Sequence, residues 1–245
     1  MPVNKNKNKD LPEEKTPHIS EMFNRISRRY DFLNRLLSLR QDVRWRNRMA
    51  HYLPKGNDLR VLDVASGTGD VPIALAKKSK VLRFVIGIDR AEDMLALGRK
   101  KIARQNQRLK WVLFPADAEE LPFCAESFDA VTMAFGIRNV SNREQTLQEM
   151  ARVVRSGGRV IILEFSLPTN PLFRIPYLFY FRHLLPVIGG RLSGNRNAYR
   201  YLNRSVEDFP AGRVFGKMLT RAGWQKVQWK PLSFGIVTIY WGEKM

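Results

Sequence analysis

The chain has 245 residues, enough for one large domain with a full core, and its hydrophobic fraction of 44% excludes an intrinsically disordered protein. Its 42 Lys and Arg against 23 Asp and Glu give a net charge of +19, which is either generic surface charge or an attraction to a polyanion, nucleic acid or membrane. The single cysteine, Cys124, excludes a disulfide within the chain, and no Cys/His spacing typical of a metal site is present.

The chain begins with MPVNKNKNKD, which contains no apolar stretch and so does not resemble a secretory signal. We predict a disordered basic tail over residues 1–17 and a single domain over 18–245. Within 19–53, apolar side chains recur at spacings of one, three and four residues, which predicts helix. Residues 18–55 are therefore expected to form an N-terminal helical cap.

Strands and helices alternate through the middle of the chain. Short apolar strands are predicted at 59–65, 81–89, 109–117, 128–137 and 157–165, with helices at 71–79, 91–106 and 143–154. This alternation predicts an α/β fold with a Rossmann-like, mostly parallel sheet covered on both faces. Two last strands, 224–231 and 235–244, are three residues apart, which predicts an antiparallel hairpin and completes a seven-stranded sheet.

The loop ASGTGD, residues 65–70, follows the first strand at the edge of the sheet where ligands bind in such folds. Gly67 and Gly69 allow the backbone to approach a ligand closely, although a simple packing turn is the alternative for the loop alone. Asp89, twenty residues further on, is placed to accept hydrogen bonds from a ribose diol. Pro72 replaces the third glycine of a dinucleotide motif, which argues against NAD.

Two more acidic residues favour S-adenosylmethionine as the ligand. Asp63, just before the loop, matches a cationic group such as a sulfonium, and Asp117 at the end of the third strand could meet an adenine edge or simply cap a turn. With the terminal hairpin, these residues indicate a class I S-adenosylmethionine-dependent methyltransferase. The expected cofactor contacts are Asp63, Gly67, Thr68, Gly69, Asp89, Asp117 and Ala118.

Three blocks of the chain resemble the ubiquinone/menaquinone biosynthesis C-methyltransferases, and the likeness runs from about Met22 to Glu243. The blocks are YDFLNRLLSLRQDVRW from Tyr30, RVVRSGGRVIILEFS up to Ser166, and FGIRNV over 135–140. This chain has Asp42 where the first block usually has histidine, so no proton-transfer role is assigned there.

The resemblance implies C-methylation of a prenylated quinol ring in respiratory quinone biosynthesis, with demethylmenaquinol as the favoured substrate. It places Arg138 and Asn139 beside the methyl group, where they would handle the quinol oxygens, while Tyr30 on the cap would complete the pocket. Packing within an amphipathic helix is the alternative role for Tyr30. No metal is required by this chemistry.

Residues 167–210 are expected to form a substrate lid after the fifth strand. Arginines and aromatic residues fill this segment, and no acidic residue lies between Glu164 and Glu207. Charges and prolines interrupt its most apolar part, 171–190, and argue against a transmembrane span. We expect a cytoplasmic enzyme bound peripherally to the anionic inner face of the membrane, unless the segment is an ordinary core helix with an arginine face.

Several alternatives stay open from the sequence. The substrate could be a benzoquinol of the ubiquinone pathway, and the positive charge could instead serve an RNA methyltransferase. A non-catalytic quinone-binding or membrane-binding protein is a third class. We expect no nucleic-acid partner, because the motif typical of enzymes that methylate base amino groups is absent, and the sequence leaves a homodimer open.

Overall fold

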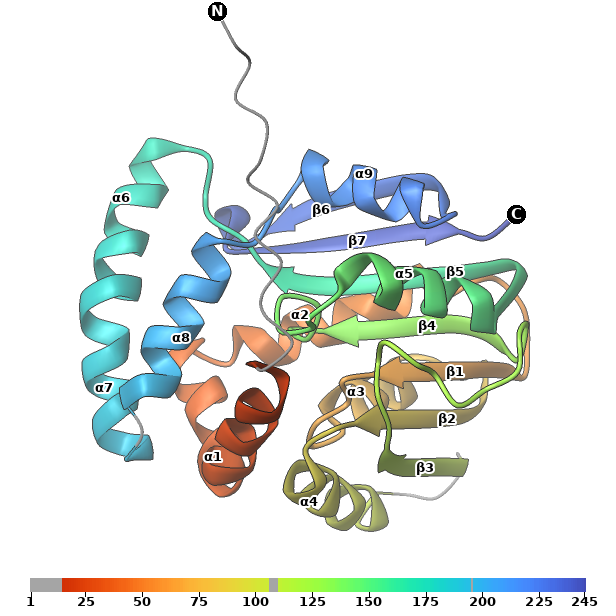
Figure 1. Ribbon diagram of the computed structural model, residues 1–245, viewed down its shortest axis with the longest axis horizontal. Helices are drawn as coiled ribbons and strands as arrows, with labels where there is room; N and C mark the ends of the chain where they lie inside the picture. The colour runs from red at the N-terminus through yellow and green to blue at the C-terminus, as the bar shows by residue number, and fades with distance from the viewer. Residues whose placement is uncertain (1–14, 106–109, 195) are drawn as a thin grey trace, which may run out of the picture.

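The computed structural model describes residues 15–105, 110–194 and 196–245 (Figure 1). Most of the tail predicted over 1–17 lies outside the described residues. Its last three residues belong to the first helix, α1, which spans Lys15–Leu37.

A seven-stranded sheet forms the centre of the fold, with the strand order β3-β2-β1-β4-β5-β7-β6. The first five strands pair in parallel, and β7 pairs antiparallel with both β5 and β6. The predicted mostly parallel sheet with a terminal hairpin is therefore confirmed. The strands span Leu59–Val64 (β1), Leu82–Asp89 (β2), Lys110–Pro115 (β3), Phe128–Ala134 (β4), Val154–Phe165 (β5), Gln225–Leu232 (β6) and Val237–Glu243 (β7).

Helices cover both faces of the sheet. On one face, α5 (Arg143–Val153) and α9 (Arg213–Arg221) bury Leu147, Phe215 and their neighbours against the sheet. On the other face, α2 (Gln41–Met49) and α3 (Asp70–Lys78) bury Trp45, Leu75 and their neighbours, while α4 (Glu92–Ala103) packs on β2 and β3. These two cores hold the strand ends in fixed positions, and the strand ends carry the loops of the site.

The cap and the lid share a third core of their own. Helix α1 packs against α7 (Leu185–Ser193) and α8 (Arg196–Glu207) through Ile26, Leu33, Phe181 and Tyr199, among other buried side chains. Helix α6 (Pro171–Phe179) leads into this group. In Figure 1 these helices lie beyond the arrowheads of β1 and β4, so they cover the end of the sheet where a ligand is expected.

The predicted helical cap is divided in two. Leu39 and Arg40 adopt positive φ angles of 51° and 60°, which ends α1 and redirects the chain into α2. Neither residue is a glycine, so the composition gave no signal for this break.

The lid is more helical than its prolines suggested. The chain stays helical from Pro171 to Ser193 and passes through Pro176 and Pro186. A π-helical turn over Tyr180–Leu184 precedes Pro186, and the amide of Leu185 bonds to the carbonyl of Tyr180, five residues back. This wider turn accommodates the hydrogen bond that proline cannot donate. In the described part of the chain, no helix is long and apolar enough to cross a membrane.

Candidate active site

The loop after β1 curls tightly and is fixed by the end of β2. Ala65, Gly67 and Gly69 all have positive φ angles, of 55°, 54° and 76°. The amide of Gly67 donates a 2.8 Å hydrogen bond to Asp89 Oδ2, and the amide of Ala91 donates one of the same length to Asp89 Oδ1. Burial raises the pKa of Asp89 above its usual value. Each carboxylate oxygen retains a lone pair, so Asp89 can accept further hydrogen bonds from a ligand.

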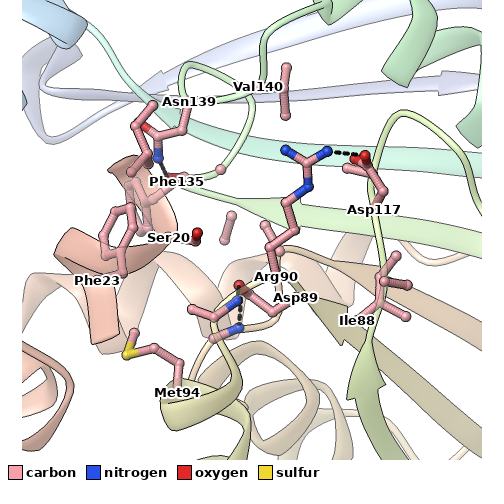
Figure 2. Close-up of a pocket in the computed structure, with 18 of the residues that line it drawn as sticks. Ser20, Phe23, Ile88, Asp89, Arg90, Met94, Asp117, Phe135, Asn139 and Val140 are labelled. Atoms are coloured by element: carbon pink, nitrogen blue, oxygen red, sulfur yellow. Dashed lines mark hydrogen bonds and ion pairs between the residues drawn. The ribbon is translucent and has the colours of Figure 1, made fainter. Parts of the chain in front are cut away.

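A first pocket of about 780 Å³ of empty space, partly open to solvent, lies above this loop. Figure 2 shows it between Phe23 and Ser20 of α1, Met94 of α4, Asp89 at the end of β2 and Asn139 in the loop after β4. The predicted residues that line it are Tyr30, Gly67, Asp89, Asp117, Ala118 and Asn139. Sequence reasoning thus located six of the ten predicted site residues at one pocket, although they come from five separate segments.

Asp117 does not face the first pocket as a free carboxylate. Strand β3 ends at Pro115, earlier than predicted, so Asp117 lies in the following loop. Its Oδ2 forms an ion pair with Arg90, and its Oδ1 accepts a 3.0 Å hydrogen bond from the amide of Glu119. Arg90 extends across the pocket toward Asp117 (Figure 2) and was missed in the sequence, although it directly follows Asp89.

Three of the predicted cofactor contacts, Asp63, Thr68 and Gly69, do not line this pocket. Asp63 is fully buried below the loop, where its carboxylate accepts hydrogen bonds from Thr132 (2.6 Å) and Ser66 (2.7 Å). Burial raises the pKa of Asp63 to about 7. A carboxyl group so placed supports the loop from below and does not face the first pocket.

Thr68 and Gly69 instead connect the loop to the surrounding helices. Gly69 precedes the first residue of α3. The Thr68 hydroxyl donates a 2.6 Å hydrogen bond to Asp31 of α1, and Lys101 of α4 bonds to both residues. These contacts attach the cap helix to the loop and to α4, so Thr68 links the cap to the sheet.

A second pocket, with about 700 Å³ of empty space, lies beneath α1, α2 and α8. Arg138 lines this pocket and not the first one. Its guanidinium donates 2.7 Å and 2.6 Å hydrogen bonds to Glu164 and to the carbonyl of Phe135, and its buried Nε has no hydrogen-bond partner in the described structure. Because a buried donor without a partner is costly, this atom suits a ligand oxygen.

The two pockets share the side chains of Phe23, Tyr30 and Phe135. Asn139 in the first pocket accepts a 3.0 Å hydrogen bond from the hydroxyl of Tyr201, which lines the second. Phe135 adopts a positive φ of 60° directly after β4, which ends that strand at Ala134 and turns the chain between the pockets. A ligand in the first pocket and a ligand in the second would therefore come together at these shared side chains.

The residues that line the first pocket fit S-adenosylmethionine. The lining includes the carboxylate of Asp89 at the end of β2 and both polar and apolar side chains at 116–119. At Gly67 a ligand can come close to the backbone because no side chain is in the way. A side chain at position 67 would need a positive φ and would point toward Met94 and Asp89. In the described ranges, no group of three or more His, Cys, Asp or Glu side chains is arranged to hold a metal ion.

Comparison with known proteins identifies the family of this chain. Residues 8–244 match the model of the ubiE/COQ5 methyltransferase family. The chain is 46% identical over 231 residues to a ubiquinone/menaquinone biosynthesis C-methyltransferase UbiE of Geobacter sulfurreducens, covering 94% of this chain and 90% of that one. It is 42% identical over 223 residues to a demethylmenaquinone methyltransferase of Thermus thermophilus, covering 91% of this chain and all of that one.

A solved structure supports the fold independently. A SAM-dependent methyltransferase from Thermotoga maritima superimposes with a TM-score of 0.65 at 19% identity, covering 93% of this chain and all of that one. At that identity the likeness concerns the fold alone.

Proposed function

Because the chain belongs to the ubiE/COQ5 methyltransferase family, we propose that it methylates a ring carbon of demethylmenaquinol, a prenylated 1,4-naphthoquinol, to give menaquinol. The enzyme is a C-methyltransferase of quinone biosynthesis that uses S-adenosylmethionine. One observation carries the substrate proposal: a pocket with a buried arginine adjoins the cofactor pocket and shares Phe23, Tyr30 and Phe135 with it.

In the proposed complex, Asp89 accepts hydrogen bonds from the ribose hydroxyls, and the segment of Asp117 and Ala118 lies along the adenine. When bound, S-adenosylmethionine supplies an electrophilic methyl group on a positively charged sulfur. Gly67 allows the cofactor to lie against the loop backbone. Phe23 and Ser20 of the cap line the pocket and would shield the bound cofactor from part of the solvent, which would favour a reaction that merges opposite charges.

We assign Arg138 to the quinol oxygen next to the reacting carbon. Its guanidinium stays charged at any physiological pH, so it cannot act as a simple base. It can instead stabilise the quinolate through its free Nε, while Glu164, fully buried, fixes its orientation. The quinol would first give its hydroxyl proton to water, and Arg138 would favour this ionisation by its positive charge. The ring carbon would then gain the methyl group as the methyl–sulfur bond breaks. Loss of the ring proton to water and return of a proton to the oxygen would restore the aromatic quinol.

Tyr30 and Asn139 complete the junction between the pockets. Burial raises the pKa of Tyr30, while Arg46 and Arg138 act in the opposite direction, so this hydroxyl lies within the field of both arginines. We propose that Tyr30 and the Asn139 amide contact the quinol ring as it meets the methyl group.

Purified protein with carbon-13-labelled S-adenosylmethionine tests the proposal. With demethylmenaquinol as substrate we expect the label in a methyl group on a ring carbon, identified by its carbon chemical shift. A parallel reaction with a demethylated benzoquinol measures the preference for the naphthoquinol. Label in an O-methyl ether, or label transferred to RNA and to neither quinol, would contradict the proposed function.

We further propose that the enzyme works at the anionic cytoplasmic face of a membrane, where its substrate lies. The helical segment from α6 to α7 exposes large apolar side chains at intervals of three to five residues. The interval of five residues, from Phe179 to Leu184, coincides with the π-helical turn. The exposed side chains are Leu172, Ile175, Phe179, Leu184, Ile188 and Leu192. Such a stripe beside arginines is typical of a helix that lies in the lipid interface.

The segment from α6 to α7 carries three arginines, Arg174, Arg182 and Arg191. Arg182 forms an ion pair with Glu207, so we expect Arg174 and Arg191 to supply the positive charge that attracts lipid. Each such charge contributes about 1 kcal/mol at an anionic surface. We expect the Arg174→Gln/Arg191→Gln variant to lose vesicle binding at physiological salt, and Arg182→Gln, as a matched control, to lose less. Equal sedimentation with neutral and anionic vesicles would contradict the electrostatic part.

A further inference from the structure

The second pocket contains a second buried guanidinium, that of Arg46 on α2. Its Nη1 donates a 2.6 Å hydrogen bond to Asp42 Oδ2, and the two side chains are only 7% and 4% exposed. Ser38 donates a 3.0 Å hydrogen bond to the other oxygen of Asp42. All three residues line the pocket, so this pair lies at the wall of the cavity and not in the solid core.

The Arg46–Asp42 pair resembles the Arg138–Glu164 pair, and each arginine lies beside one of two neighbouring aromatic rings, those of Phe135 and Phe165. The guanidinium carbon of Arg46 lies 5.2 Å from the ring centre of Phe135, and that of Arg138 lies 5.4 Å from the ring centre of Phe165. The two rings are 4.5 Å apart and inclined by 34°. Each guanidinium is thus held by its own carboxylate beside one of two adjacent rings.

Arg46 retains donors for a ligand. In the described part of the chain, its guanidinium donates to Asp42 alone, and Asp70, 3.9 Å away, is shared with Arg35 and Lys101. A guanidinium carries five N–H groups in a rigid plane, so several remain for an oxygen in the pocket. Asp42 is beside it as an acceptor for a hydroxyl hydrogen.

A 1,4-quinol carries oxygens at opposite ends of its ring, and one guanidinium cannot reach both. We propose that Arg46 and Asp42 bind the quinol oxygen para to the one that Arg138 stabilises, Arg46 as donor to that oxygen and Asp42 as acceptor from its hydroxyl. The inference rests on the proposed quinol substrate. It makes the second pocket a site for a ring with two para oxygens, so that the ring is oriented before the methyl group is transferred.

Two substrates separate this role from a purely structural one. The first is a prenylated 1,4-naphthoquinol. The second is the corresponding naphthol, which keeps the hydroxyl next to the reacting carbon and lacks the one para to it. The variant Arg46→Met/Asp42→Leu removes the pair without leaving a buried charge alone. A matched control is Arg159→Met/Glu243→Leu, which removes an ion pair of the same 2.6 Å length that lies outside both pockets.

For the wild type, we expect the naphthol to have a KM about 10–100-fold higher than the quinol, as for loss of hydrogen bonds to a charged group. In the Arg46→Met/Asp42→Leu variant, KM for the quinol rises by a similar factor and KM for the naphthol hardly changes. The affinity of the double variant for the cofactor, measured by calorimetry, stays at the wild-type value. The control variant keeps the wild-type KM for both substrates. Arg46→Lys retains the charge, so its KM for the quinol should lie between those of the wild type and the Arg46→Met/Asp42→Leu variant, while its KM for the naphthol hardly changes.

Equal losses for the quinol and the naphthol would overturn the proposal, because a structural pair cannot distinguish the two substrates. If the double variant does not fold, Asp42→Asn is compared with wild type on the same substrates, with the same selective loss expected. A wild-type enzyme that methylates neither substrate would instead contradict the proposed function, which is a separate outcome.

Discussion

The two pockets are built in different ways. The first consists mainly of backbone turns and short segments at the ends of β1, β2, β3 and β4, with α1 as its roof. The second consists of side chains from three helices, α1, α2 and α8, with Phe135, Arg138 and Phe165 as its floor. A pocket made by strand ends depends on the sheet, whereas a pocket made by helices depends on how the cap and lid pack. Changes to residues that line only one pocket should therefore leave the other largely intact.

The largest effect is expected at Arg138. Arg138→Leu combined with Glu164→Gln removes the charge at the quinol oxygen without leaving a buried carboxylate alone. We expect kcat to fall about 10²–10³-fold, as on removal of a donor that stabilises an oxyanion. Calorimetric affinity for S-adenosylmethionine should not change. A rate within about threefold of wild type would move the role to Asn139.

Asp89 provides the opposite test, in the first pocket. Asp89→Ala removes the ribose acceptor and the hydrogen bond from Gly67, so cofactor affinity should weaken by about 1.5–3 kcal/mol. The KM for the quinol should stay near its wild-type value when the cofactor is saturating. Unchanged affinity in calorimetry would remove Asp89 from the cofactor site.

Gly67→Val should weaken the cofactor at least as much, because a branched side chain at φ 54° is strained and lies at the pocket wall. Measuring the melting temperature without cofactor distinguishes strain from lost binding. A variant that binds S-adenosylmethionine like wild type would show that the cofactor does not lie against this loop.

Asp63 tests the support beneath the first pocket. Its pKa is about 7 in the folded protein against an ordinary value of 3.8, so its contribution to stability is present below pH 4 and is lost as pH rises toward 7. Asp63→Asn cannot ionise, so relative to wild type it should gain at least about 1.4 kcal/mol of stability, the value of one pKa unit, between pH 4 and pH 8. Unfolding by urea at pH 4, 6 and 8 measures the difference, and a difference independent of pH would contradict the shifted pKa.

The smallest effect is expected at Tyr201, which joins the lid to Asn139. Tyr201→Phe removes one hydrogen bond, worth about 0.5–1.5 kcal/mol, so kcat/KM for the quinol should fall about two- to tenfold. Cofactor affinity serves as the internal control. A larger loss of cofactor affinity than of quinol turnover would show that the two pockets are not separable here.

The difference between the pockets also explains how far the sequence could predict the site. Strand periodicity, the glycine loop and the spacing to Asp89 are local features, and they located the first pocket. Tyr201 and Asn139 are 62 residues apart and meet only through the packing of α8, for which no local pattern exists. The same holds for Arg46, which the break at Leu39 and Arg40 directs into the second pocket. Asp63 does not face the first pocket, because the direction of its side chain depends on the register of β1 with β4, which no local pattern shows.

A structure of the protein with S-adenosylhomocysteine and demethylmenaquinol would show whether cofactor and quinol occupy the two adjoining pockets. We predict that the nucleoside lies against Asp89 and Asp117 in the first pocket and that the quinol ring lies in the second. The thioether sulfur and the reacting carbon should face each other at Phe23, Tyr30 and Phe135, with one quinol oxygen within hydrogen-bonding distance of Arg138. A quinol ring bound away from Arg138, or a nucleoside in the second pocket, would contradict this prediction.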